Sequence, residues 1–163
     1  MLITLTNEEL KHAAQIALLR NKSQRLAGRA DGKVIESSIM ADTIGAEGEL
    51  AVSKALGLPW DGSWLPIPLW DKWKREGNDV GRLEVRTTNH ATGRLILHHS
   101  DKDNSPYILV ISNERPIFRL AGWLFASEGK HKKYWATHVP RPCYMVKQQH
   151  LRTVEDLVKI IRN

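Results

Sequence analysis

Apolar positions recur at helical spacing in two segments of the N-terminal half. In the first, Thr6 and Glu9 stand three residues apart, the spacing of a capping box that opens a helix. Small and apolar side chains then follow one side of the segment until Gly28 and the Asp31-Gly32 pair. This pattern predicts a helix over residues 6–27.

The second helical segment covers residues 38–56 and ends before Gly57 and Pro59, both typical of a helix C-terminus. From residue 80 the pattern changes to alternation and short apolar runs, which predict strands. The run at 107–112 is almost wholly apolar and predicts a central strand buried on both faces. The expected strands are 83–88, 94–98, 107–112, 117–124 and 143–146, and Thr153 caps a terminal helix.

This order of elements predicts an α/β fold, with α+β as the alternative, built on a central mixed sheet of about four strands flanked by helices. The 163 residues are the size of one domain. We divide this domain into an N-terminal helix (6–27), a core (38–124) and a C-terminal basic extension with a helix (125–163).

The intervening residues 58–78 hold three prolines and four tryptophans, Trp60, Trp64, Trp70 and Trp73. Tryptophans at this density most often surround a small core, and we adopt that interpretation. Stacking of nucleobases on exposed rings is the alternative.

Composition narrows the class of protein. Hydrophobic residues make up 42% and charged residues 26% of the chain, as in globular proteins. We see neither an apolar run long enough to span a membrane nor the basic start of a signal peptide. The lone Cys143 excludes an internal disulfide and a zinc site built on cysteines. We therefore expect a cytoplasmic protein.

The net charge of +6 is unevenly distributed. Residues 34–70 hold one basic and five acidic side chains, whereas residues 105–163 hold ten basic and four acidic ones. Carboxylates within a basic chain suit a protein that holds a cation against a phosphodiester backbone, although each carboxylate taken alone is as compatible with a solvated helix face.

The central candidate site lies in residues 77–86. Asp79 precedes a tight turn at Gly81-Arg82, and Glu84 and Arg86 follow two positions apart on the predicted strand, so they share one face. The turn would bring Asp79 near Glu84. Two carboxylates beside a cation form a site for Mg²⁺ that faces a phosphate or an attacking water. The alternative is a surface hairpin with an ion pair.

A third carboxylate is expected from the second helix. Gly45 and Gly48 would allow this helix to approach another backbone closely, and Glu49 could then reach the same centre. Glu47 is the less favoured substitute for Glu49.

A helix with Gly-x-x-Gly-Glu, then Asp79, then Glu84-x-Arg86 on a strand resembles the PD-(D/E)XK nuclease superfamily, in particular a small phage or prophage-type member. The resemblance covers about residues 42–124. It implies a restriction-endonuclease-like core with Glu49, Asp79 and Glu84 as Mg²⁺ ligands, and Mn²⁺ as a substitute ion. It further implies cleavage of nucleic acid, with DNA the expected substrate, and a homodimer, the form in which many members act.

The sequence departs from the family pattern in two ways. Arg86 stands where a lysine is usual, and arginine stays protonated, so it can stabilise charge but cannot act as a general base. Only four residues separate Asp79 from Glu84, which is short for this pattern. The alternative function is therefore a weak or inactive nuclease-fold protein that binds nucleic acid or a protein partner, for example a phage-encoded inhibitor.

Basic residues outside this site are candidates for contacts with the phosphate backbone. Residues 130–135 form a basic run with Tyr134 and Trp135 beside it, a pattern typical either of a solvated face or of a phosphate-binding loop. The expected contacts are Lys130, Lys132, Lys133, Arg82 and Arg94, with the basic N-terminal helix. We interpret residues 101–104 as a solvated acidic loop. His98 and His99 point to opposite faces of a strand, so they cannot both bind one metal ion, and a phosphate contact by one of them is the less favoured alternative.

Overall fold

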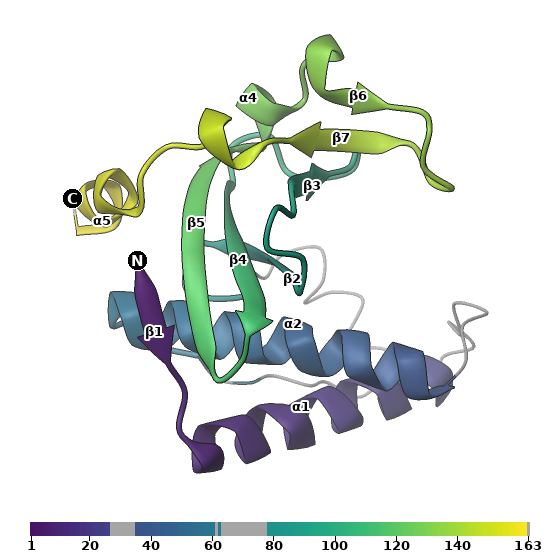
Figure 1. The fold of residues 1–163 in the computed structure, drawn as a ribbon, viewed down its shortest axis with the longest axis vertical. Helices are drawn as coiled ribbons and strands as arrows, with labels where there is room; N and C mark the ends of the chain where they lie inside the picture. Colours follow the sequence, from purple (N-terminus) through teal and green to yellow (C-terminus); the bar gives the residue numbers. More distant parts are fainter. Residues whose placement is uncertain (27–34, 61, 63–77, 163) are drawn as a thin grey trace.

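The computed structural model describes residues 1–26, 35–60, 62 and 78–162. Figure 1 shows its arrangement: two long helices beneath a twisted sheet, with a smaller sheet above. The elements in chain order are β1 (Leu2–Thr4), α1 (Asn7–Leu26), α2 (Ile35–Leu56), β2 (Glu84–Thr88), β3 (Leu95–Leu97), β4 (Pro106–Glu114), β5 (Ile117–Phe125), α4 (Ala126–Gly129), the 3-10 turn η1 (Lys132–Tyr134), β6 (Trp135–Ala136), β7 (Cys143–Val146), the 3-10 turn η2 (Gln148–His150) and α5 (Val154–Arg162).

The main sheet has four strands in the order β1-β5-β4-β2, and it is mixed, because β2 runs parallel to β4 while the other neighbours are antiparallel. A mixed four-stranded sheet within an α/β fold is therefore confirmed. The composition of the sheet differs from the expectation in one strand. The segment around 95–97 belongs to a second sheet, β3-β7-β6, and β1 takes its place in the main sheet.

The two faces of β4 explain why both sheets exist. Ile108 and Val110 lie in a core shared with α2, β5 and α5, whereas Tyr107, Leu109 and Ile111 lie in a second core shared with β3 and β7. All five side chains are buried, as predicted for a central strand. Helices thus cover one face of the main sheet, and the second sheet covers the other (Figure 1). The main sheet is therefore flanked by helices, as predicted, on this one face.

A close contact between α2 and β2 fixes the helix on the main sheet. A Cβ atom at Gly48 would lie 1.9 Å from the Oγ1 atom of Thr87, so only glycine allows this approach. At Gly45 a Cβ atom would meet nothing within 4 Å. The predicted close approach is therefore made by Gly48 alone. On its opposite side α2 packs against α1 through Ala13, Ala17 and Ala46.

Some sequence expectations fall on residues that the structure does not describe, including the helix stop at Gly28 and 31–32 and the environments of Trp64, Trp70 and Trp73. Trp60 is described, and it packs against the main core. Among the described residues, none of the helices combines the length and the apolar character that crossing a membrane requires.

Candidate active site

A tight turn places Asp79 beside the start of β2. Gly81 adopts a φ of 59°, which favours glycine, and Val80 and Leu83 exchange backbone hydrogen bonds across the turn. Both of these side chains are fully buried, which anchors the turn in the core. Asp79 also donates its backbone N–H to Leu83, 3.0 Å away. The predicted turn at 81–82 is thereby confirmed.

The carboxylate of Asp79 is fixed against the strand. Its Oδ2 atom accepts a hydrogen bond of 2.8 Å from the backbone N–H of Val85, the residue after Glu84. Burial, followed by the charge of Glu84, raises the pKa of Asp79 from 3.8 to about 6. Asp79 and Glu84 are therefore near enough for their charges to repel each other within a poorly solvated site.

Glu84 and Arg86 face the space between the two sheets. In the parallel register Glu84 pairs with Tyr107 and Arg86 with Leu109, both of which lie in the core beneath the second sheet. The guanidinium of Arg86 also lies 4.9 Å from the centre of the Tyr107 ring. Glu84 and Arg86 thus share a face, as the two-residue period predicts.

Two residues of the 101–104 loop complete the surroundings of Glu84. Asp101 accepts a hydrogen bond of 3.1 Å from Arg86, and the Lys102 ammonium lies 4.0 Å from the Glu84 carboxylate. The Asp101 side chain is only 10% exposed, whereas that of Asp103 is 65% exposed, so the prediction of a solvated acidic loop is confirmed for Asp103 and wrong for Asp101. Burial raises the pKa of Glu84, and Arg86 and Lys102 oppose that rise.

Glu49 reaches the same region from α2 but is already bound. Arg20 donates to both carboxylate oxygens at 2.8 and 2.9 Å, and the indole N–H of Trp60 donates to one of them at 2.8 Å. Burial raises the pKa of Glu49 despite the opposing Arg20, and the charge of Asp79 adds to the rise. Glu49 therefore lies within electrostatic range of Asp79.

Glu47, the alternative to Glu49, has a different place. Its side chain is fully buried, and its oxygens accept hydrogen bonds of 2.6 to 3.0 Å from Arg115. Arg115 lies between β4 and β5, so this pair ties α2 to the main sheet.

The described residues contain no group of three or more His, Cys, Asp and Glu side chains arranged to hold a metal ion. Two carboxylates, water and substrate phosphates are, however, a common ligand set for Mg²⁺. Asp79 and Glu84 offer the hard oxygen ligands that this ion prefers. The donor chemistry thus fits an ion held by two carboxylates, and the role of Glu49 as a third ligand stays a prediction.

The predicted phosphate-binding residues do not form one surface. Lys130 points into the protein: it donates to the Asp103 carboxylate at 2.7 Å, to the His99 carbonyl at 3.0 Å and to the Asp101 carbonyl, and its side chain is 14% exposed. It therefore stabilises the 101–104 loop. Arg82 and Lys132 are both exposed, but they lie on different elements. Arg82 is on the turn before β2, and Lys132 is on η1.

Arg94 and Lys133 do lie together, along one hollow beside the second sheet. His98 and His99, which follow β3, have different surroundings, as expected of successive residues in an extended segment. His98 is near the charges of Asp101 and Arg86, whereas the His99 ring contacts Trp135 and Tyr144. His98 is thus the histidine on the side of the candidate site.

Four residues around the carboxylates were not identified from the sequence: Arg20, Trp60, Asp101 and Lys102. The helical spacing of α1 gives Arg20 no distinction from its basic neighbours. Asp101 and Lys102 could have been suspected only from their place between two strands of different sheets.

Comparison of the chain with protein-family models, curated proteins and solved structures finds no match.

Proposed function

We propose that the protein is a Mg²⁺-dependent phosphodiesterase of PD-(D/E)XK type that cleaves nucleic acid, with DNA as the substrate. One observation carries the proposal. Asp79 is fixed by the Val85 N–H next to Glu84. The Lys102 ammonium lies 4.0 Å from the Glu84 carboxylate, and Arg86, which pairs with Asp101, shares the strand face of Glu84. Carboxylates held near each other in a partly desolvated place, with cations next to them, suit an ion and a phosphate bound side by side.

Each side chain has a distinct part in this proposal. Asp79 and Glu84 would hold the ion, with Mn²⁺ as a substitute for Mg²⁺. When bound, the ion would neutralise charge on the scissile phosphate and make water a better nucleophile. Arg86, oriented by Asp101, stabilises negative charge on the phosphate. Lys102 supplies a second cation beside Glu84.

A second candidate function is a nuclease-fold protein without activity, which binds nucleic acid or a protein partner. The observation that favours it is the pairing of Glu49 with Arg20 and Trp60, which engages both oxygens of the predicted third ligand. Such a protein needs no metal ion. Calorimetric titration with Mg²⁺ and Mn²⁺ separates the two candidates, since heat of binding that Asp79→Asn abolishes is expected only of the nuclease.

The direct test is incubation of the protein with single-stranded, double-stranded and branched DNA, with Mg²⁺, with Mn²⁺ and with EDTA. We expect ion-dependent cleavage that falls by at least about a thousandfold in Asp79→Asn and in Glu84→Gln. Glu155→Gln on α5 is the matched control, because it removes an exposed carboxylate far from β2 in the chain. Full activity in either site variant would refute the proposal.

A further inference from the structure

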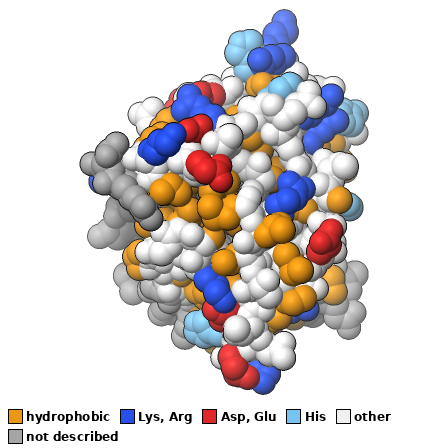
Figure 2. Space-filling model, turned by 60° about the vertical axis from the view of Figure 1, so that its left-hand side comes forward, with side chains coloured by type: hydrophobic (Ala, Val, Ile, Leu, Met, Phe, Trp, Pro, Cys, Tyr) orange, Lys and Arg blue, Asp and Glu red, His pale blue; other side chains and the backbone are white. Residues whose placement is uncertain are grey.

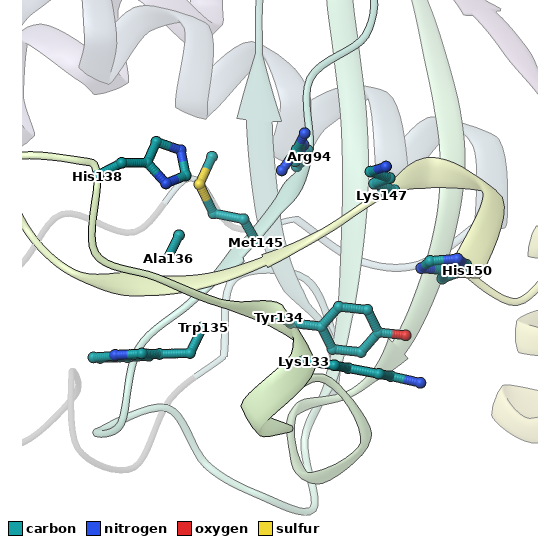
Figure 3. A pocket seen from close by; sticks show the side chains of 9 residues that line it. All are labelled: Arg94, Lys133, Tyr134, Trp135, Ala136, His138, Met145, Lys147 and His150. Atoms are coloured by element: carbon teal, nitrogen blue, oxygen red, sulfur yellow. The ribbon is translucent and has the colours of Figure 1, made fainter.

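A hollow of about 300 Å³ lies against the second sheet, and Figure 3 shows the side chains around it. Three of these are permanent cations, two are histidines and two are large aromatic residues, and none is acidic. The lining residues are Arg94, Lys133, Tyr134, Trp135, Ala136, His138, Met145, Lys147 and His150. A hollow of this volume is at the lower end of the range of ligand-binding pockets.

A second hollow, of about 340 Å³, connects the first to the candidate active site. Arg86 and two threonines of β2 line one side of it, and Arg94, Ile96 and Met145 contribute from the second sheet. Arg94 and Met145 line both hollows, so the two adjoin. The lining of the two adjoining hollows therefore runs from Arg86 on β2, past the second sheet, to η1.

The chemistry of the first hollow combines positive charge with flat rings. Arg94, Lys133 and Lys147 are exposed, and the Lys133 ammonium lies 4.8 Å from the centre of the Tyr134 ring. The Tyr134 and His150 rings lie 5.7 Å apart at 45°, which leaves an open, tilted pair rather than a closed stack. In Figure 2, Lys, Arg and His side chains also gather at the top of the molecule, where the second sheet lies in Figure 1.

We propose that these adjoining hollows form a binding site for a single-stranded polynucleotide. Phosphates of such a strand would pair with Arg94, Lys133 and Lys147, while an unstacked base would lie against Tyr134. In a duplex the bases are stacked within the helix, so their faces are not accessible to a ring that lines a hollow. The proposal rests on the proposed function in one respect: the Arg86 end of the two hollows delivers the strand to Asp79 and Glu84.

The first test measures binding without cleavage. The fluorescence anisotropy of a labelled twelve-residue oligothymidylate is followed in EDTA at several salt concentrations. We expect Arg94→Gln and Lys147→Gln each to weaken binding several-fold and to reduce the salt slope by about 0.7, the value for one contact to a single strand. Lys159→Gln on α5 is the matched control, since Lys159 is exposed and lines neither hollow.

The second test isolates the base. Tyr134→Leu keeps an apolar side chain and removes the ring, and we expect it to weaken binding on the order of tenfold. The same oligonucleotide without bases should bind the wild type correspondingly more weakly, and its affinity should not change in Tyr134→Leu. His150→Ala removes the other, exposed ring of the pair and should weaken binding less than Tyr134→Leu. Thermal unfolding of both variants shows whether a loss of binding reflects a folding defect.

Three results would overturn the proposal: equal affinity for the oligonucleotide and its abasic form, tighter binding to a duplex of equal length, or no difference between Lys147→Gln and Lys159→Gln. Hydrolysis of bis(4-nitrophenyl) phosphate separates this proposal from the proposed function. This small diester needs only the carboxylate site, so pocket variants should cleave it normally, whereas Asp79→Asn should bind the oligonucleotide and fail to cleave.

Discussion

Asp79 and Glu84 stand on the two arms of one tight turn, and the charge of Glu84 adds to burial in raising the pKa of Asp79 to about 6. The backbone N–H of Val85 still holds the Asp79 carboxylate in place. The protein thus keeps a repulsive arrangement of carboxylates that costs stability when both are ionised. Such sites are typical of function rather than of folding.

The first prediction concerns stability against pH without metal ions. The folded-state pKa of Asp79 is above its ordinary 3.8, so the folded protein binds this proton more tightly than the unfolded chain. The associated stability is present at low pH and is lost as pH rises from about 4 to about 6. We expect a loss of up to ~3 kcal/mol from this residue. Urea unfolding of wild type and Asp79→Asn in EDTA measures it, and parallel pH curves for the two proteins would contradict it.

A second prediction links the same proton to activity. An ion binds the ionised carboxylate, so cleavage with Mg²⁺ should rise through pH about 6 and level off above it. Raising the Mg²⁺ concentration should shift the midpoint to lower pH, because the ion competes with the proton. Initial rates between pH 5 and 8 at two ion concentrations measure the midpoint. A midpoint pH that does not change with the Mg²⁺ concentration would argue against Asp79 as a ligand.

The two cations beside Glu84 should differ in their contributions. Lys102→Gln is expected to lower the cleavage rate about 10- to 100-fold, with partial recovery in Lys102→Arg. Arg86→Lys should retain or raise activity if position 86 corresponds to the lysine of the superfamily. Cleavage rates of all three variants, normalised to the amount of folded protein, measure these contributions. Wild-type rates in Lys102→Gln would show that Lys102 has no part in the reaction.

The Arg20–Glu49 pair is predicted to be a determinant of stability. Both side chains are about 10% exposed, so Arg20→Ala leaves a buried carboxylate without its partner. We expect a loss of about 3–5 kcal/mol, whereas Arg20→Met combined with Glu49→Leu should lose much less. Thermal unfolding compares the variants. The double variant also tests Glu49 as a ligand, since it should keep cleavage only if two carboxylates are enough.

Gly48 and Gly45 provide a matched pair on one helix. Gly48→Ala should lower the free energy of unfolding by about 1–3 kcal/mol, because its Cβ atom would lie 1.9 Å from Thr87 Oγ1. Gly45→Ala should be neutral or raise it by about 0.5–1 kcal/mol, since nothing lies near and alanine favours the helix. Thr87→Ala added to Gly48→Ala should recover part of the loss. Equal effects at both glycines would argue against the close contact.

The sequence pattern predicted most of the main sheet, because long apolar runs such as 107–112 are themselves the signal of burial. The strand at 143–146 was predicted to the residue. The second sheet was not foreseen. Its strands have two to four residues, and Leu95 pairs with Val146, which lies about a third of the chain away in sequence. Strands this short give little periodicity to recognise, and a long-range pairing leaves no pattern in the local sequence.

The candidate site, like the sheets, could be predicted from the sequence only in part. Asp79, Glu84 and Arg86 lie within eight residues, so turn geometry and strand period were enough to predict that they face one another. Their partners Arg20, Asp101 and Lys102 come from other elements, and only the packing of those elements brings them near. Charge alone suggested solvent for Asp101, but the Arg86 guanidinium and the backbone N–H of His98 both donate to its carboxylate.

Lys130 has a consequence for how the protein could be divided. It lies beyond residue 124, where the sequence suggested that the core ends, yet it holds the segment that carries Asp101 and Lys102. A fragment that stops at residue 124 would keep Asp79, Glu84 and Arg86. It would lose the hydrogen bonds by which Lys130 holds the segment with Asp101 and Lys102. The C-terminal part is thus not a removable appendage, and the smallest unit able to assemble the site extends at least to the residues that follow β5.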